Sequence, residues 1–297
     1  PLSCYFSFLV FRRLTGNHLI SFFFALLYAF SPYHLAHLGQ LSLASIQFFP
    51  LIILAFLKIR EKPTLKRALF LGLTVALSFL TDLYYGYFSL LLLSFLFSFD
   101  LLFNFKGGQR LWSGIKAVPY YLVSVITAAL LSLPFLYPLL ATRLKNIDLG
   151  LPLTTGLDDL IVHTARPWDY FLPALTHPWL GAAAAWFKDW LESNRGSYWF
   201  YLPHTTEAVI YLGFAVSLLA LSAIVYFCLR RRKDPASYWV PVFFATALLL
   251  FLISLPPDIY LGKNNEHHII LLSFRLHQLF PMFRAYVRLG VLVLLLF

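Results

Sequence analysis

Long apolar runs separated by short polar turns follow one another along most of the chain. A helix that crosses a membrane needs about 20 mostly apolar residues, and runs of that order recur from residue 18 onward. The pattern therefore predicts an all-α, polytopic membrane fold with about eight spanning helices. The principal runs cover residues 18–31, 41–59, 65–105, 118–140, 208–229 and 238–255, and the last begins near Leu289.

The run from Leu65 to Phe105 is too long for one crossing. As a helix rising 1.5 Å per residue it would be roughly twice as long as the ~30 Å hydrocarbon layer is thick. We expect a hairpin, with its turn at the polar group Asp82–Gly86. The run at 118–140 contains three prolines, which predicts a kinked helix.

Two stretches break this pattern with polar residues. Residues 141–207 hold most of the acids and five of the seven tryptophans, and residues 256–288 form a second polar loop. Within the first, Gly181–Asn194 is typical of an amphipathic helix that lies in the membrane interface with its tryptophans on one face. These breaks predict three parts: N-terminal membrane helices at 1–140, an extracytoplasmic segment at 141–207, and C-terminal membrane helices at 208–297.

Composition supports the membrane class. The chain is 60% hydrophobic and only 12% charged, whereas soluble domains carry about 25% charged residues. Its net charge of +10 comes from short basic runs beside the apolar runs, so it indicates membrane orientation and no nucleic-acid partner. With these runs in the cytoplasm, strict alternation places both polar loops outside the cell membrane.

Several acidic residues stand where they could carry chemistry. Asp82 could be a catalytic acid or base at the hairpin turn, or a solvated turn residue. Asp158-Asp159 could hold a divalent cation, Mg²⁺ or Mn²⁺, or could cap a short helix over Leu160–His163. Glu207, with His204 nearby, faces water or serves a site just before an apolar run.

The arginines Arg166, Arg284 and Arg288 lie in or beside the polar loops. A guanidinium group matches the geometry of a phosphate, so any of them could bind one. The alternative is that they extend to lipid headgroups. No nucleotide-binding loop, zinc-protease pair or serine-hydrolase motif is found in the sequence.

An ordered set of short stretches spans most of the chain and resembles the GT-C superfamily of polytopic glycosyltransferases, in particular uncharacterised bacterial and archaeal members. The stretches are Arg12–Gly16, Phe30–Leu38, Phe49–Leu51, Asp169–Pro173 with His177-Pro178, Glu207-Ala208 with Tyr211–Gly213, and Arg284–Arg288.

The resemblance implies transfer of a sugar from a polyprenyl-phosphate donor to an acceptor on the outer face of the membrane. Arg166, Arg284 or Arg288 would stabilise the phosphate, and Asp82 or Glu207 would line the acceptor side. The other expected substrate contacts are Asp169, His204, Tyr84 and Tyr85.

The chain starts and ends within apolar runs, which predicts a piece of a longer protein. In the resembling family the main catalytic acid lies in the first external loop, which would precede Pro1, so we expect the piece alone to be inactive. Two other functions stay open: a transporter or flippase of lipid-linked saccharides, and a non-catalytic scaffold for cell-envelope assembly. A transporter would favour a midplane site and inverted repeats, neither of which the sequence indicates.

Overall fold

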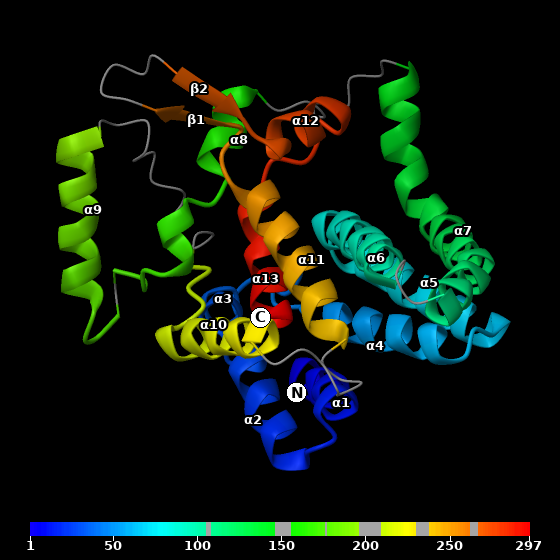
Figure 1. The fold of residues 1–297 in the computed structure, drawn as a ribbon. Helices are drawn as coiled ribbons and strands as arrows, with labels where there is room; N and C mark the ends of the chain where they lie inside the picture. Colours follow the sequence, from blue (N-terminus) through cyan, green and yellow to red (C-terminus); the bar gives the residue numbers. More distant parts are fainter. Residues whose placement is uncertain (105–107, 146–155, 176, 196–208, 230–237, 262–266) are drawn as a thin grey trace. The chain divides into compact units, whose positions relative to one another are not determined.

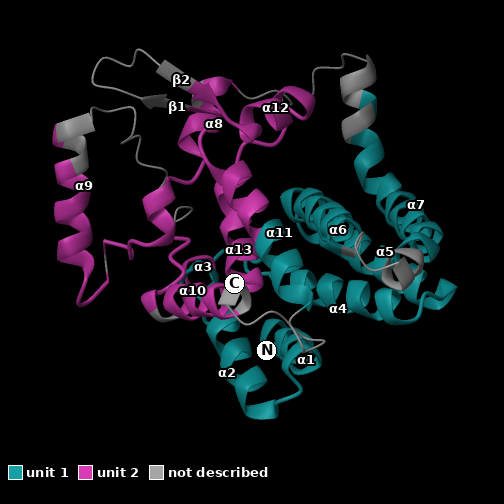
Figure 2. Cartoon of the chain, in the orientation of Figure 1, with its two compact units in different colours: residues 1–34, 38–151, 231–246 teal, residues 35–37, 152–230, 247–297 magenta. Residues whose placement is uncertain are grey.

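The chain folds almost entirely into α-helices in a computed structural model, which describes residues 1–104, 108–145, 156–175, 177–195, 209–229, 238–261 and 267–297 (Figure 1). It divides into two compact units (Figure 2). Unit 1 consists of residues 1–34, 38–151 and 231–246, and unit 2 of residues 35–37, 152–230 and 247–297.

The regular elements in the described part of unit 1 are all helices. Its elements are α1 (Leu2–Thr15), α2 (His18–Ala29), the start of α3 (Pro32–Ala36), α4 (Phe48–Glu61), α5 (Leu65–Thr81), α6 (Leu83–Asn104), α7 (Gly108–Lys145) and the first half of α11 (Trp239–Ser254).

Local sequence explains where the first helices of unit 1 meet. Gly16 ends α1 with a φ of 68°, a left-handed conformation that suits glycine, and its N–H donates to the Arg12 carbonyl. Asn17 then caps α2 by accepting a hydrogen bond from the Ile20 N–H at 3.1 Å. The chain therefore reverses between α1 and α2 within two residues.

The predicted hairpin between α5 and α6 is confirmed. Asp82 separates the two helices, and its Oδ1 accepts from the N–H groups of Tyr84 at 2.9 Å and Tyr85 at 3.2 Å. The role of Gly86 differs from the expected turn: a Cβ there would lie 2.1 Å from the Phe79 ring. Gly86 thus lets the two helices approach each other one turn beyond Asp82.

Small residues bring α5 and α7 together. Ala68, Gly72 and Ala76 recur every fourth residue of α5 and are all buried. A Cβ on Gly72 would lie 2.6 Å from the Ser124 carbonyl oxygen of α7. Helices inside membranes commonly use such spacing for close backbone packing.

Three described helices are long and apolar enough to cross a membrane: His18–Ala36, Leu83–Phe103 and Gly114–Pro138. The last contains the predicted prolines Pro119 and Pro134 within α7. Shorter apolar helices cover Val216–Tyr226, Trp239–Ser254 and Tyr286–Leu296. Within the described residues the structure thus has fewer helices of spanning length than the eight expected.

The run at 41–59 shows one reason for this difference. Only Phe48–Glu61 is a regular helix, and the preceding residues form turns. Their carbonyl groups bond to buried tyrosines instead: Tyr85 donates to Leu43 at 2.5 Å and Tyr28 to Ile46 at 2.9 Å. Side-chain donors from distant residues replace the helical hydrogen bonds there.

Unit 2 contains most of the polar segments. Its elements are α8 (Leu157–Val162), the 3₁₀ helix η1 (Pro167–Tyr170), α9 (Gly181–Arg195), α10 (Phe214–Leu229), the second half of α11, β1 (Asp258–Leu261), β2 (His267–Ile270), α12 (Leu272–Leu279), the 3₁₀ helix η4 (Tyr286–Leu289) and α13 (Gly290–Leu296). The antiparallel pair β1–β2, with Asp258 opposite Ile270, was not expected from the sequence.

The predicted amphipathic helix is confirmed as a helix at α9. Trp186 and Trp190 on it, and Trp179 before it, are exposed. Its placement in a membrane interface stays a prediction.

Candidate functional site

The segment from α8 to η1 is anchored inside unit 2 by the end of α11. The N–H of Ala165 donates to the Ser254 carbonyl at 2.8 Å, and the Tyr170 and Ser254 hydroxyls lie 2.7 Å apart. The Tyr170 ring also packs edge-on against Phe251, with ring centroids 4.9 Å apart. These contacts fix the backbone that presents the polar side chains of α8.

Arg166 holds this segment together from within. It is buried, and its guanidinium donates to the carbonyl of Ile161 and to the carbonyl and hydroxyl of Thr164, at 3.2 to 3.4 Å. Ile161 belongs to the last turn of α8, where helix carbonyls lack helical donors. The structure therefore gives Arg166 a structural role at the end of α8, and substrate binding by it stays a prediction.

Asp169 is buried beside Arg166. Its Oδ2 accepts from the Arg166 backbone N–H at 2.7 Å, which secures the start of η1. Burial raises the pKa of Asp169, and the hydrogen bond from the Arg166 N–H opposes this shift. Asp169 is thus a capping residue in this structure.

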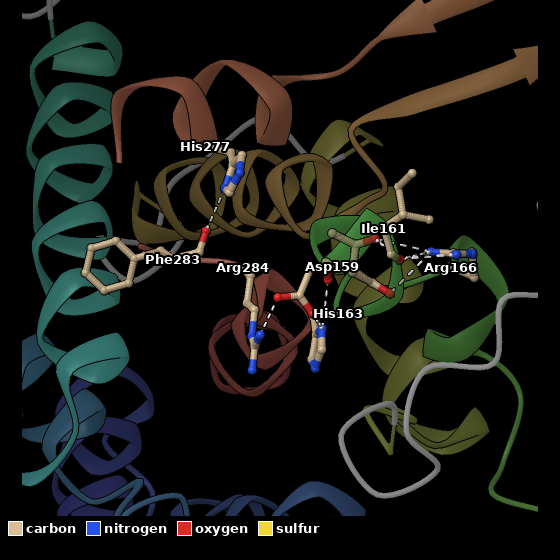
Figure 3. A network of polar contacts seen from close by, with 8 residues as sticks. Asp159, Ile161, His163, Arg166, His277, Phe283 and Arg284 are labelled. Carbon is tan, nitrogen blue, oxygen red and sulfur yellow. Dashed lines mark hydrogen bonds and ion pairs between the residues drawn. The ribbon is translucent and has the colours of Figure 1, made fainter. Parts of the chain in front are cut away.

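Asp159 is the centre of a group of three charged or titratable side chains (Figure 3). Its Oδ2 accepts a hydrogen bond from Arg284 Nη1. His163 Nδ1 lies 2.8 Å from the Asp159 backbone carbonyl oxygen and 3.4 Å from Oδ1. Each carboxylate oxygen therefore serves a different partner. The Asp159 and Arg284 side chains are 34% and 39% exposed, so this ion pair remains accessible to solvent.

Backbone hydrogen bonds also connect the segment that carries Arg284 to the segment that carries Asp159. The N–H of Val287 donates to the His163 carbonyl at 3.1 Å, and the N–H of His163 donates to the Asp159 carbonyl at 3.3 Å. His277 of α12 supports the same loop, with its Nδ1 3.1 Å from the Phe283 carbonyl (Figure 3). Arg284 consequently lies between two held positions, Phe283 at His277 of α12 and Val287 at His163.

Arg288 lies in η4, just before α13, and is half-buried. Two residues further on, Gly290 packs closely against Ile210. A Cβ at Gly290 would lie only 2.5 Å from the Ile210 Cγ2. Arg284 and Arg288 thus stand on the segment that leads into an apolar helix.

The predicted site residues divide into those that meet and those that do not. Asp159 and Arg284 are in contact in unit 2. Asp82, Tyr84 and Tyr85 belong to unit 1, where Asp82 caps α6 and Tyr85 is buried with its hydroxyl 3.0 Å from that of Tyr33. Glu207 and His204 lie outside the described residues, as does the Asp158 side chain.

The predicted alternative for Asp158-Asp159, an N-terminal helix cap, is not what the structure shows. Helix α8 begins earlier, at Leu157, after Gly156 as its N-cap, and no side chain caps it. No group of three metal-binding side chains occurs within the described part of the chain. Binding of a divalent cation by Asp158 and Asp159 stays a prediction.

His163 is the site residue that sequence reasoning missed. A signal existed, because Asp159 and His163 stand four residues apart and such pairs meet on a helix. Arg284, by contrast, is 125 residues from Asp159, a separation that no local pattern can bridge.

Comparison with protein families matches residues 1–297 to one described as "Domain of unknown function (DUF6311)". No curated protein matches the chain. No solved structure matches it either.

Proposed function

The chain belongs over its whole length to the DUF6311 family, and we propose that it is a membrane glycosyltransferase of the GT-C type. The donor in this proposal is a sugar carried on a polyprenyl phosphate, and Arg284 binds the phosphate. In this proposal the polar loops lie on the outer side of the cell membrane.

The apolar helices support a lipid-embedded substrate. Three helices have the length and composition of membrane spans, and exposed apolar side chains continue along α7, among them Leu122, Ile126 and Leu130. A polyprenyl chain is soluble in the same hydrocarbon layer as such a surface. In this proposal the polyprenyl chain of the donor stays in the hydrocarbon layer and reaches the apolar surface of the protein from there.

The observation that carries the proposal is the accessible Arg284–Asp159 ion pair. A guanidinium group prefers planar oxyanions, carboxylate and phosphate alike, because its N–H groups form a fixed fork. Asp159 occupies this position on Arg284 in the structure. A donor phosphate can take the place of the carboxylate while the Val287–His163 backbone bond keeps the loop attached.

The reaction requires a new bond from an acceptor oxygen to the anomeric carbon of the sugar. The bond from that carbon to the phosphate oxygen breaks, and its electron pair leaves with the polyprenyl phosphate while the acceptor proton goes to a base. Negative charge therefore grows on the phosphate, where Arg284 would stabilise it most strongly in the transition state. Arg288 lies four residues further along the same segment, in η4.

The test compares two arginine variants in the natural protein in membranes. Arg284→Gln removes the proposed phosphate ligand, and Arg275→Gln removes an exposed arginine of α12 that bonds to Gln278 at 3.3 Å. The substrates are polyprenyl phosphates carrying radiolabelled glucose, mannose or galactose, and the readout is label transferred to water-insoluble or soluble acceptor. Arg284→Gln should lower transfer by about 100-fold, the typical effect of losing one transition-state donor.

Retention of full transfer in Arg284→Gln would refute the assigned site. Movement of intact labelled lipid across the membrane, with no sugar released, would replace the enzyme by a transporter of lipid-linked saccharides. Arg275→Gln should match the wild type in both assays.

A further inference from the structure

The Asp159 carboxylate is shared between a permanent cation and a titratable one. Arginine keeps its charge at every physiological pH, whereas histidine is the side chain that changes charge between pH 5 and 8. One carboxylate oxygen of Asp159 contacts Arg284, and the other lies 3.4 Å from His163 Nδ1. The backbone carbonyl of Asp159, 2.8 Å from the same Nδ1, holds the imidazole ring beside the carboxylate. The His163 side chain is only 12% exposed, so the imidazole side of this contact is largely shielded from solvent.

Release of Arg284 from Asp159 has a cost that depends on His163. With His163 neutral, an anion bound to Arg284 leaves the Asp159 charge without its cation and next to a second negative charge. With His163 protonated, Asp159 keeps a cationic partner at its other oxygen while Arg284 turns to the ligand. Proton uptake by His163 therefore favours anion binding at Arg284, and by linkage the bound anion favours that proton.

We propose that Asp159, His163 and Arg284 form a proton-linked site for a singly charged phosphodiester, with His163 as the residue that couples pH to affinity. This inference rests on the proposed function and adds regulation of the same site. The chemical class follows from the donor, since a sugar joined to a polyprenyl phosphate is a phosphodiester and keeps one negative charge across this pH range.

Other charged groups stand near His163 and act in known directions. Arg166 is bound to the end of α8, Arg288 belongs to η4, and His277 of α12 contacts the loop before Arg284. The two arginines are charged throughout and shift affinity equally at each pH. His277 is the second titratable group close to Arg284, so the experiment must separate it from His163.

The probe is dihexyl phosphate, whose charge is constant in this range, with neutral trihexyl phosphate as the matched control compound. Binding to the purified natural protein in detergent is measured by calorimetry at about pH 5.5 and about pH 8, on either side of histidine titration. The wild type should bind dihexyl phosphate about tenfold more tightly at the lower pH, a coupling in the usual range. Trihexyl phosphate should show no such change.

Three variants test which residue causes the pH dependence of binding. His163→Gln should bind with the affinity of the wild type at high pH and lose the pH dependence. Asp159→Asn should bind more tightly than the wild type at high pH, because Arg284 is released, and should also be insensitive to pH. His277→Gln should keep the full dependence.

Two results would contradict the inference, and they differ in what else they affect. If the wild type binds dihexyl phosphate equally well at both pH values, or if His277→Gln instead of His163→Gln removes the pH dependence, the coupling role of His163 is wrong while the phosphate site stands. If the wild type binds no dihexyl phosphate at either pH, the site and the proposed function fail together.

Discussion

Asp169 shows at the residue scale how burial sets the chemistry of this segment. Its pKa is raised by burial above the ordinary value of 3.8, so the protonated carboxyl group is favoured in the folded state. The stabilising contribution is therefore fully present below pH 3.8 and is lost as the pH rises through the raised value.

Asp169→Asn should remove this dependence, because an amide oxygen can still accept from the Arg166 N–H without ionising. Relative to this variant, the wild type should lose stability between acidic and neutral pH. Denaturant unfolding in detergent across that range measures the difference. Parallel curves for the two proteins would show that Asp169 has the same pKa in the folded and unfolded states.

Residue-scale predictions from the sequence named charged residues of the polar loops without identifying their partners. Arg284 and Asp159 were both chosen as site residues, and they meet. Arg166 was chosen for the same reason as Arg284, yet it is buried against carbonyls of its own segment. Composition cannot distinguish an arginine that faces solvent from one that closes a helix end, because burial is decided by the tertiary fold.

At the scale of elements, the turn between α5 and α6 accounts for Asp82. Its carboxylate accepts two backbone N–H groups at the start of α6, which is the role of a helix N-cap. Of the two alternatives considered for Asp82, catalytic residue or turn residue, these contacts favour the second.

Asp82→Ala should destabilise the protein by about 1 kcal/mol, whereas Asp82→Asn and Asp82→Ser should cost much less because both can cap a helix. Thermal unfolding of the three variants in detergent provides the comparison. Equal damage from Asp82→Asn and Asp82→Ala would contradict the capping role, because it would mean that the negative charge itself is required for stability.

The sequence pattern predicted helix positions where polar residues beside the helix also marked its end. The α5–α6 hairpin and α9 are of this kind. The stretch before α4 differs, since the hydroxyl groups of Tyr28 and Tyr85 donate hydrogen bonds to its carbonyl groups. Hydropathy reports which residues avoid water, and it cannot report which carbonyls distant hydroxyl groups will satisfy.

At the scale of the whole molecule, unit 1 contains a buried ion pair between two of its helices. Asp100 of α6 is fully buried and forms an ion pair with Arg60 of α4, whose side chain is 7% exposed. The hydroxyl of Tyr238, just before α11, donates to Asp100 Oδ1 at 2.6 Å. Three elements distant in sequence are thus joined by one carboxylate.

Removal of one member of this pair leaves the other charge buried and uncompensated. Arg60→Gln or Asp100→Asn should each cost about 3–5 kcal/mol, and the double variant should cost clearly less than their sum. A double-mutant cycle by denaturant unfolding measures the coupling. Additive losses would show that the two side chains do not depend on each other.

The central claim is that a lipid-linked phosphodiester binds at Arg284, and photo-crosslinking tests it most directly. A polyprenyl-phosphate sugar with a diazirine beside the phosphate would be irradiated with the natural protein in membranes, and the labelled peptides identified by mass spectrometry. We predict labelling within residues 157–166 and 280–289, abolished by Arg284→Gln and unaffected by Arg275→Gln. Labelling confined to other parts of the chain, unchanged in Arg284→Gln, would contradict the account.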